Sequence, residues 1–174
     1  MMPWHEEAVG KHHDRKSFDC GSAELNDFLQ RYARQSHDLG GSKTFLAVDD
    51  GDGRSIRGFY SLAPTSIQPE RVPAEIRQGL GRHEVPGFRL TRLAVSLPLQ
   101  GQGLGGQLLL AAGRRCLRAA AEVGGVVMAI DAKSERAADW YRTLGALPLA
   151  ETPRSLLLPL ATIAAALKAA GHDL

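Results

Sequence analysis

The stretch Gln100-Gly101-Gln102-Gly103-Leu104-Gly105-Gly106 holds four glycines in seven residues, between an apolar run and a long helical pattern. Glycine lets the backbone come close to a ligand, and the first N–H groups of a helix have no partner within the helix. Together with the helix dipole, these groups attract a phosphate. We therefore interpret this stretch, named the phosphate loop below, as a pyrophosphate site. A glycine turn that merely begins a helix is the alternative.

The residues on either side of the phosphate loop predict a strand, a helix and a second strand. Residues 88–95 have the composition of a strand, and residues 103–123 carry apolar side chains at helical spacing. Residues 125–130 form a short apolar run, which indicates a buried strand. The order strand, helix, strand predicts a parallel βαβ crossover.

The N-terminal third predicts one helix and a hairpin. Ser22 can cap a helix that ends near Gly40. Apolar residues recur along it at Leu25, Phe28, Leu29, Tyr32 and Ala33. Residues 44–48 and 56–62 are rich in β-forming residues and flank a glycine turn, so they predict two antiparallel strands.

The remaining segments predict further elements around the same sheet. Residues 69–80 suggest a short helix, and Pro86 and Gly87 make the following segment loop-like. Residues 134–144 have the length of one more helix, whereas 146–150 and 155–160 suggest terminal strands. We expect an α/β (α+β mixed) fold with a mostly antiparallel sheet flanked by helices. With 174 residues, the chain fits one domain, 1–174.

Composition excludes several classes of protein. Hydrophobic residues at 44% and charged residues at 23% are typical of globular proteins. No apolar run approaches the ~20 residues of a membrane span, and the N-terminus is too polar for a signal peptide, so we expect a cytoplasmic protein with no membrane partner. Cys20 and Cys116 have no metal-ligand spacing, and we expect both to be reduced.

We expect no metal site. His12 and His13 are adjacent, and adjacent side chains point apart on regular elements. No third ligand is spaced for them in the sequence.

A dinucleotide-binding fold is a rival interpretation of the phosphate loop. Gly101, Gly103 and Gly106 satisfy its glycine fingerprint, and Asp131 stands where an acid could bind a ribose. However, residues 96–100 separate the strand from the first glycine, and too few residues follow Asp131 for a doubly wound sheet. An oxidoreductase is therefore disfavoured.

The phosphate loop resembles the signature of the GNAT superfamily of N-acetyltransferases, which is Gln or Arg, two variable residues, Gly, one variable residue, then Gly or Ala. Gln100, Gly103 and Gly105 fill it. The family's next motif, Asn-x-x-Ala-x-x-x-Tyr followed by Gly-Phe, is matched at Ala137, Tyr141 and Gly145. Ser134 replaces its Asn and Ala146 its Phe.

This resemblance implies that acetyl-CoA is the co-substrate and that no metal is needed. In the family, the loop binds the pyrophosphate of coenzyme A, and the preceding strand pairs with its acetyl and pantetheine groups. The implied acetyl-CoA-binding residues are Leu93, Ala94, Val95, Gln100, Gly101, Gln102, Gly103, Leu104, Gly105, Gly106 and Ser134.

Further motifs resemble the bacterial toxin branch of the GNAT enzymes. They are Phe18-Asp19-Cys20-Gly21, Leu25-Asn26-Asp27-Phe28-Leu29, Gly58-Phe59-Tyr60-Ser61-Leu62-Ala63, Arg92-Leu93-Ala94-Val95 and Asp131-Ala132-Lys133. The resemblance implies acetylation of the α-amino group of aminoacyl-tRNA, which blocks translation, and neutralisation by a ribbon-helix-helix antitoxin of the DUF1778 type. A homodimer is left open. So are a GNAT enzyme acting on a small amine or protein N-terminus, and a non-catalytic acyl-CoA-binding module.

The resemblance also makes Tyr141 the candidate general acid, since a phenol can protonate the departing thiolate. On the sequence alone, a packed aromatic beside Trp140 is the favoured interpretation of Tyr141, and the family resemblance reverses that order. Basic residues that lie near these motifs in the sequence are candidates for binding tRNA phosphates. The alternative is that they form a solvated, charged surface without a ligand. They are Arg77, Arg82, Arg89, Arg92, Lys133 and Arg136.

Overall fold

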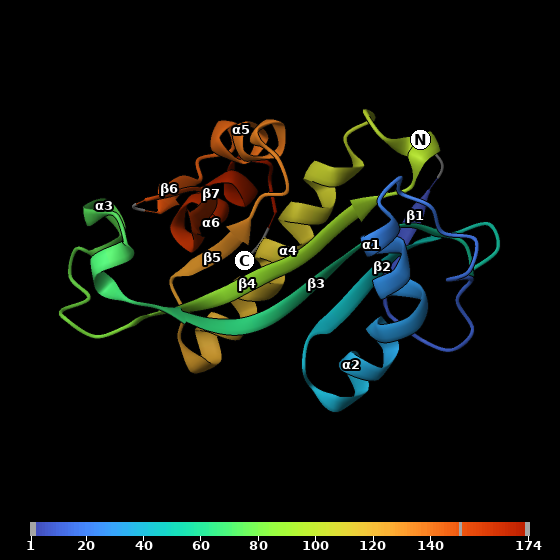
Figure 1. The fold of residues 1–174 in the computed structure, drawn as a ribbon, viewed down its shortest axis with the longest axis horizontal. Coiled ribbons are helices and arrows are strands. Elements are labelled where there is room, and N and C mark those ends of the chain that lie inside the picture. The colour runs from blue at the N-terminus through green and yellow to red at the C-terminus, as the bar shows by residue number, and fades with distance from the viewer. Residues whose placement is uncertain (1–2, 150, 173–174) are drawn as a thin grey trace. The chain divides into compact units, whose positions relative to one another are not determined.

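The computed structural model describes residues 3–149 and 151–172. Within these residues, seven strands form one sheet in the order β1-β2-β3-β4-β5-β7-β6 (Figure 1). The strands are β1 (Trp4–Ala8), β2 (Lys43–Asp49), β3 (Ile56–Ile67), β4 (Val85–Val95), β5 (Val127–Asp131), β6 (Leu147–Leu149) and β7 (Thr152–Pro159). The helices are α1 (Ala23–Asp27), α2 (Ala33–Leu39), α3 (Ala74–Arg77), α4 (Leu104–Val123), α5 (Glu135–Thr143) and α6 (Leu160–Ala169).

The strand directions confirm the predicted mixed sheet. β1 with β2, β2 with β3, β5 with β7, and β6 with β7 all pair antiparallel. β4 and β5 pair in parallel, with Gly87 opposite Val127, and α4 is the crossover between them. The predicted βαβ unit is therefore confirmed. None of the described helices is both long and apolar enough to cross a bilayer.

The chain divides into two compact units, and each is made from two separate segments. Unit 1 comprises Met1–Ala63 and Thr91–Ala111, and unit 2 comprises Pro64–Leu90 and Ala112–Leu174. Strands β3 and β4 and helix α4 each begin in one unit and end in the other.

In unit 1, one helical segment covers the β1–β2–β3 antiparallel strands, and Figure 1 shows α1 and α2 beside β2. Ser22 caps α1 by accepting a hydrogen bond from the backbone N–H of Leu25, as predicted. Residues 28–32 between α1 and α2 form a π-helical turn, which the sequence did not predict. This wider turn brings Ala33, rather than Tyr32, over Phe28. Ala33 is therefore buried, while Tyr32, predicted on the apolar face, is 53% exposed.

In unit 2, strand β4 begins earlier than predicted. Pro86 and Gly87, expected in a loop, lie within β4. A Cβ at Gly87 would lie 2.4 Å from the carbonyl oxygen of Val127, so glycine is needed here for close approach to β5. A glycine in a strand marks either a turn or such an approach, and the sequence pattern alone does not separate the two.

The C-terminal elements correct the prediction in part. β6 falls within the predicted 146–150, of which Ala150 lies outside the described residues. β7 begins at Thr152 and ends at Pro159, and Leu160 begins helix α6 instead of ending a strand. Leu160, Ile163 and Leu167 are buried, at helical spacing. Helices α5 and α6 both pack against β7 (Figure 1).

Two short segments complete the comparison with the prediction. The predicted helix at 69–80 is a 3-10 turn at Pro69–Arg71 followed by the single-turn helix α3. Strand β1 was not predicted, because its polar residues are only half buried on a strand at the edge of the sheet.

Candidate functional site

The phosphate loop lies in unit 1, after the 3-10 turn Leu97–Leu99 that follows β4. Gly101 and Gly103 have φ angles of +80° and +90°, in the left-handed region that favours glycine. The N–H of Gln107 donates to the carbonyl of Gly103 at 3.2 Å, so the backbone becomes helical directly after Gly103. The first N–H groups of α4 therefore follow two exposed glycines.

Gly106 is explained neither by its backbone nor by its neighbours. It lies in the first turn of α4 and its φ is not positive. Apart from its chain neighbours and the backbone of α4 itself, no described atom lies within 4 Å of where its Cβ would be. Glycine in a helix is less stable than alanine by about 1 kcal/mol. The space beside Gly106 is thus open at a cost in stability, as expected where a ligand approaches the helix closely.

The side chain of Gln100 fixes the start of the phosphate loop. Its Nε2 donates to the carbonyl of Val95 and to the carbonyl of Cys20, both at 2.9 Å. The N–H of Leu97 donates to the carbonyl of Asp19, also at 2.9 Å. Residues 18–21, whose role sequence reasoning did not find, thus hold the segment that leads into the loop.

A second layer of hydrogen bonds holds residues 18–21 in turn. Asn26 accepts from the N–H of Cys20 through its Oδ1 and donates from Nδ2 to Asp19 Oδ1, both at 2.9 Å. A backbone hydrogen bond from Gly21, followed by that from Asn26, lowers the pKa of Asp19. We name Asp19, Asn26 and Gln100, with the backbone of Cys20, the loop brace.

Strand β4 leads into the loop, and the backbone of Gly58 on strand β3 lies close to it at Ala94. A Cβ at Gly58 would lie 2.7 Å from the carbonyl oxygen of Ala94, which explains the glycine of that motif. Ala94 is buried in the core of unit 1. Next to Leu93, the guanidinium of Arg92 lies over the ring of Phe28, with 3.5 Å between its central carbon and the ring centroid.

Two of the predicted site residues, Ser134 and Tyr141, lie in unit 2. Ser134 caps α5, because its Oγ accepts from the N–H of Ala137 at 3.1 Å. Tyr141 is buried on α5, with its ring edge-on to Trp140 at 4.9 Å between centroids. Burial raises the pKa of Tyr141 to about 12, so the hydroxyl stays protonated at neutral pH. It therefore retains the proton that a general acid donates.

The predicted tRNA-binding residues differ in how they are held. Arg77, Arg82, Lys133 and Arg136 are exposed in unit 2. Arg89 is instead paired with Asp131 at 2.5 Å.

Asp131 also accepts from the hydroxyl of Ser155 at 2.8 Å. It ends strand β5, whose other neighbour, β7, is antiparallel. The doubly wound sheet of a dinucleotide-binding fold is therefore not formed.

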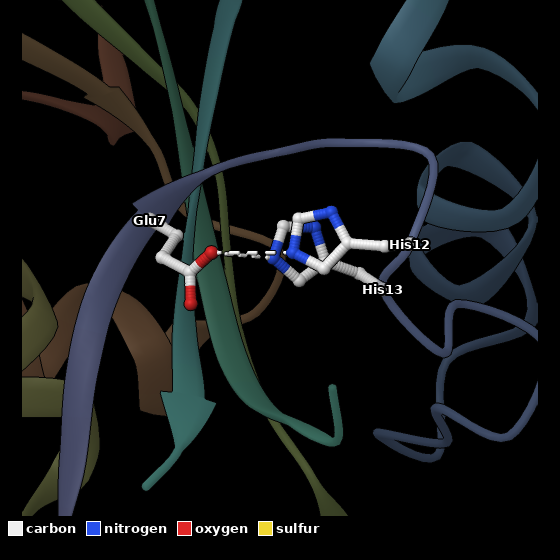
Figure 2. A group of neighbouring side chains, drawn as sticks. All are labelled: Glu7, His12 and His13. Carbon is white, nitrogen blue, oxygen red and sulfur yellow. Dashed lines mark hydrogen bonds and ion pairs between the residues drawn. The ribbon is translucent and has the colours of Figure 1, made fainter. Parts of the chain in front are cut away.

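A histidine cluster lies at β1, and it corrects one expectation. His12 and His13 were expected to point apart, but they lie in an irregular loop and their ring centroids are 3.9 Å apart. Figure 2 shows Glu7 facing both rings. Glu7 Oε1 lies 3.3 Å from His12 Nε2 and 3.2 Å from His13 Nε2, a spacing that a metal could also use.

The proton on His13 argues against a metal at this cluster. The backbone N–H of Gly10 donates to His13 Nδ1 at 2.9 Å, so Nδ1 carries no proton. A neutral His13 then has its proton on Nε2, which is the nitrogen that faces Glu7. A metal ligand would need the opposite arrangement, with a bare Nε2 and a donating Nδ1. We interpret the cluster as hydrogen bonds that tie this loop to β1.

Both cysteines are free and buried, in agreement with the expected reduced state. Burial raises the pKa of the Cys116 thiol to about 12, so this thiol is unreactive.

The chain is similar to several known proteins. No family model matches the chain. It is 36% identical over 128 residues to the tRNA-acetylating toxin of Mycobacterium tuberculosis, which covers 74% of this chain and 75% of that protein. The structure of AtaT complexed with acetyl-methionyl-tRNAfMet is similar at 25% identity with a TM-score of 0.88, and the match covers 95% of this chain and 99% of AtaT. A mutant of AtaT bound to the C-terminus of the antitoxin AtaR and to acetyl-CoA is 26% identical with a TM-score of 0.81, covering 94% and 98%.

Proposed function

Because this chain belongs to the family of tRNA-acetylating toxins, we propose that it transfers the acetyl group of acetyl-CoA to the α-amino group of an aminoacyl-tRNA and so blocks translation. It is an acyltransferase, with acetyl-CoA as donor and charged tRNA as acceptor.

The observation that carries this proposal is the open space at the phosphate loop. Apart from chain neighbours and the backbone of α4, no described atom lies within 4 Å of a Cβ position at Gly101, Gly103 or Gly106, and the loop leads into the N-terminus of α4. Backbone N–H groups at such a helix start bind phosphate without side-chain charge. We assign the pyrophosphate of acetyl-CoA to this loop, and Leu93, Ala94 and Val95 to its pantetheine and acetyl groups.

The chemistry needs few groups, because a thioester is already activated. An α-amino group has a pKa of about 7.7 to 8.0, so a useful fraction is neutral at physiological pH and can attack without a strong general base. We assign stabilisation of the developing oxyanion to backbone N–H groups of residues 93–95. Tyr141 then donates its proton to the departing thiolate, and its hydroxyl is protonated at neutral pH because burial raises its pKa.

The remaining assignments rest on the same family. We propose that residues 1–174 act as one acetyltransferase domain, supported by β3, β4 and α4, which run through both units. We also propose a ribbon-helix-helix antitoxin of the DUF1778 type as partner and action in the cytoplasm, where charged tRNA is used. A homodimer is compatible with this function but not required by it.

Gly106→Ala tests the assignment of the phosphate loop. Alanine should raise the melting temperature by about 2 to 4 °C, because it removes the cost of glycine in a helix. It should also weaken acetyl-CoA binding by at least about tenfold, since its methyl group enters the space of the phosphate. Calorimetric titration with acetyl-CoA and thermal denaturation measure the two effects.

Gly113→Ala is the matched control, on the same helix in unit 2. A Cβ at Gly113 would lie 2.6 Å from Ile163, so this variant should lose stability and keep its acetyl-CoA affinity. Acetyl-CoA binding unchanged in Gly106→Ala would contradict the assigned loop. Transfer of labelled acetyl groups to small amines or protein termini, but not to charged tRNA, would contradict the acceptor.

A further inference from the structure

We infer that Arg92 binds the last phosphodiester of the single-stranded acceptor end of the aminoacyl-tRNA, separately from the exposed basic residues of unit 2. This inference rests on the proposed function. The features that carry it all lie in unit 1.

The guanidinium of Arg92 is held in place by aromatic rings. It lies 3.5 Å above the centroid of Phe28, and Phe28 is itself buried and stacked on Phe59 at 6.3 Å, with an interplanar angle of 26°. A cation over an aromatic face is attracted to it, which orients the planar guanidinium. Phe28 takes this position at the start of the π-helical turn, a feature that is frequent at functional sites.

The hydrogen-bond donors of Arg92 have no acceptor in the described part of the chain. Other arginines are paired: Arg89 with Asp131, and Arg142 with Asp139 and the carbonyl of Pro153. Arg92 has only the contact with Phe28 and the more distant charge of Glu24. Its partial burial lowers its pKa, which reflects water lost without a bonded partner gained. A rigid, partly desolvated guanidinium of this kind is suited to bind an oxyanion.

The position of Arg92 limits which part of the substrate it can meet. It directly precedes Leu93, the first residue of the segment assigned to the acetyl group, and adjacent Cα atoms are about 3.8 Å apart. The attacking amine must come within about 3 to 3.5 Å of the acetyl carbon. A group beside that segment therefore meets the aminoacyl ester and the last nucleotides, whereas the double-stranded stem lies farther away.

The chemistry of the guanidinium selects the phosphodiester among the groups at that end. Its five N–H donors form a planar fork that matches two phosphate oxygens, and its charge is complementary to theirs. The phosphodiester between the last two nucleotides is the first anionic group that follows the aminoacyl ester along the RNA.

Three acceptors of decreasing size test this assignment. They are a full aminoacyl-tRNA, an aminoacylated trinucleotide with the terminal sequence CCA, and aminoacyl-adenosine, which has no phosphate. Arg92→Gln should lower kcat/KM about 10- to 100-fold for the first two and leave the third unchanged. Arg92→Lys, which keeps the charge but not the fork, and Phe28→Leu, which removes the aromatic face, should both give smaller losses with the same pattern.

The control is Arg31→Gln, which removes an exposed arginine from the helical segment that also carries Phe28. Arg31 is paired with Asp27. It should leave all three acceptors unaffected. Acetyl-CoA affinity and melting temperature report whether each variant is folded.

Each other pattern overturns the inference in a different way. An equal loss on aminoacyl-adenosine would mean that Arg92 acts through strand β4, and a loss confined to full tRNA would place its contact in the tRNA body. A wild-type protein that binds acetyl-CoA and acetylates none of the three acceptors would overturn the proposed function as well.

Discussion

Tyr141 is the residue at which chemistry and packing can be separated most sharply. Tyr141→Phe removes the hydroxyl and keeps the buried ring. If the phenol protonates the thiolate, turnover should fall by about 10² to 10⁴ while acetyl-CoA affinity stays nearly constant. Tyr141→Ala should in addition lose about 3 to 5 kcal/mol of stability. Acetylation rates, acetyl-CoA calorimetry and thermal melts on both variants distinguish the two roles of Tyr141. A fully active Tyr141→Phe protein would leave only the packing role.

The loop brace predicts that a residue distant from the ligand controls acetyl-CoA affinity. Asn26→Ala removes the acceptor of the Cys20 N–H, so the Cys20 carbonyl that receives Gln100 loses its support. We expect about tenfold weaker acetyl-CoA binding in Asn26→Ala and in Gln100→Ala.

The double variant distinguishes a brace from two separate contacts. If the residues act in series, Asn26→Ala with Gln100→Ala should bind acetyl-CoA no more weakly than Gln100→Ala alone. Asp27→Ala, next to Asn26 but outside the brace, is the control. Additive losses in the double variant would contradict the brace.

At the scale of residues, the sequence predicted types of group better than their pairing. The phosphate loop glycines carry their chemistry in their own backbone, so a local pattern finds them. Whether an arginine has an ion pair, as Arg89 has, or lies over an aromatic ring with no hydrogen-bond acceptor among the described residues, as Arg92 does, depends on side chains brought together by the fold. The rings of His12 and His13 likewise meet Glu7 only because their loop is irregular.

At the scale of single elements, strand β1 makes the stability of the fold depend on pH. Hydrogen bonds that the His5 ring donates to the carboxylates of Asp50 and then Glu7 raise the pKa of His5 above 6.5. Burial raises the pKa of Glu7, but hydrogen bonds from His5 and His13 outweigh it and lower the pKa below 4.5. A histidine whose pKa is raised in the folded protein stabilises the fold fully below about pH 6.5. This stabilisation is lost as the pH rises through the folded-state pKa. A carboxyl group whose pKa is lowered in the folded protein stabilises the fold above about pH 4.5. This stabilisation is lost as the pH falls through the folded-state pKa.

The contributions of His5 and Glu7 to stability are therefore both complete between about pH 4.5 and 6.5. His5→Asn should lower the melting temperature most in this window and least near pH 9, which thermal denaturation across pH would measure. A difference between the two proteins that is constant from pH 4 to 9 would show that His5 contributes through packing alone.

Elements whose apolar residues recur with a clear period were predicted from the sequence. Elements whose structure departs from the local residue pattern were not. The βαβ unit follows from a helix pattern of strong amphipathicity between two apolar runs. The π-helical turn was missed because one extra residue in a helix leaves little trace in its period. α6 was partly assigned to a strand because Leu156, Leu157 and Leu158 run directly into its first apolar residue.

For the whole molecule, binding of tRNA should depend on salt through the exposed basic residues of unit 2. The logarithm of affinity should fall linearly with the logarithm of salt concentration, and Arg77→Gln or Arg82→Gln should each reduce the slope by about one unit. Arg142→Gln is the control, because Arg142 is already held by Asp139. Filter binding across salt concentrations measures the slopes. Slopes equal to wild type in both variants would leave these arginines as a solvated surface.

The two discontinuous units have a consequence for how the protein is made. Unit 1 begins at the N-terminus but takes its last segment, with the phosphate loop, from Thr91–Ala111. A chain still being synthesised that has reached Leu90 therefore has α1 and α2 without the phosphate loop, and Tyr141 follows later still. A fragment that ends at Leu90 lacks both the loop and the tyrosine to which we assign donor binding and proton transfer. If the assigned roles hold, we expect acetyl transfer only from chains that have been translated beyond Tyr141.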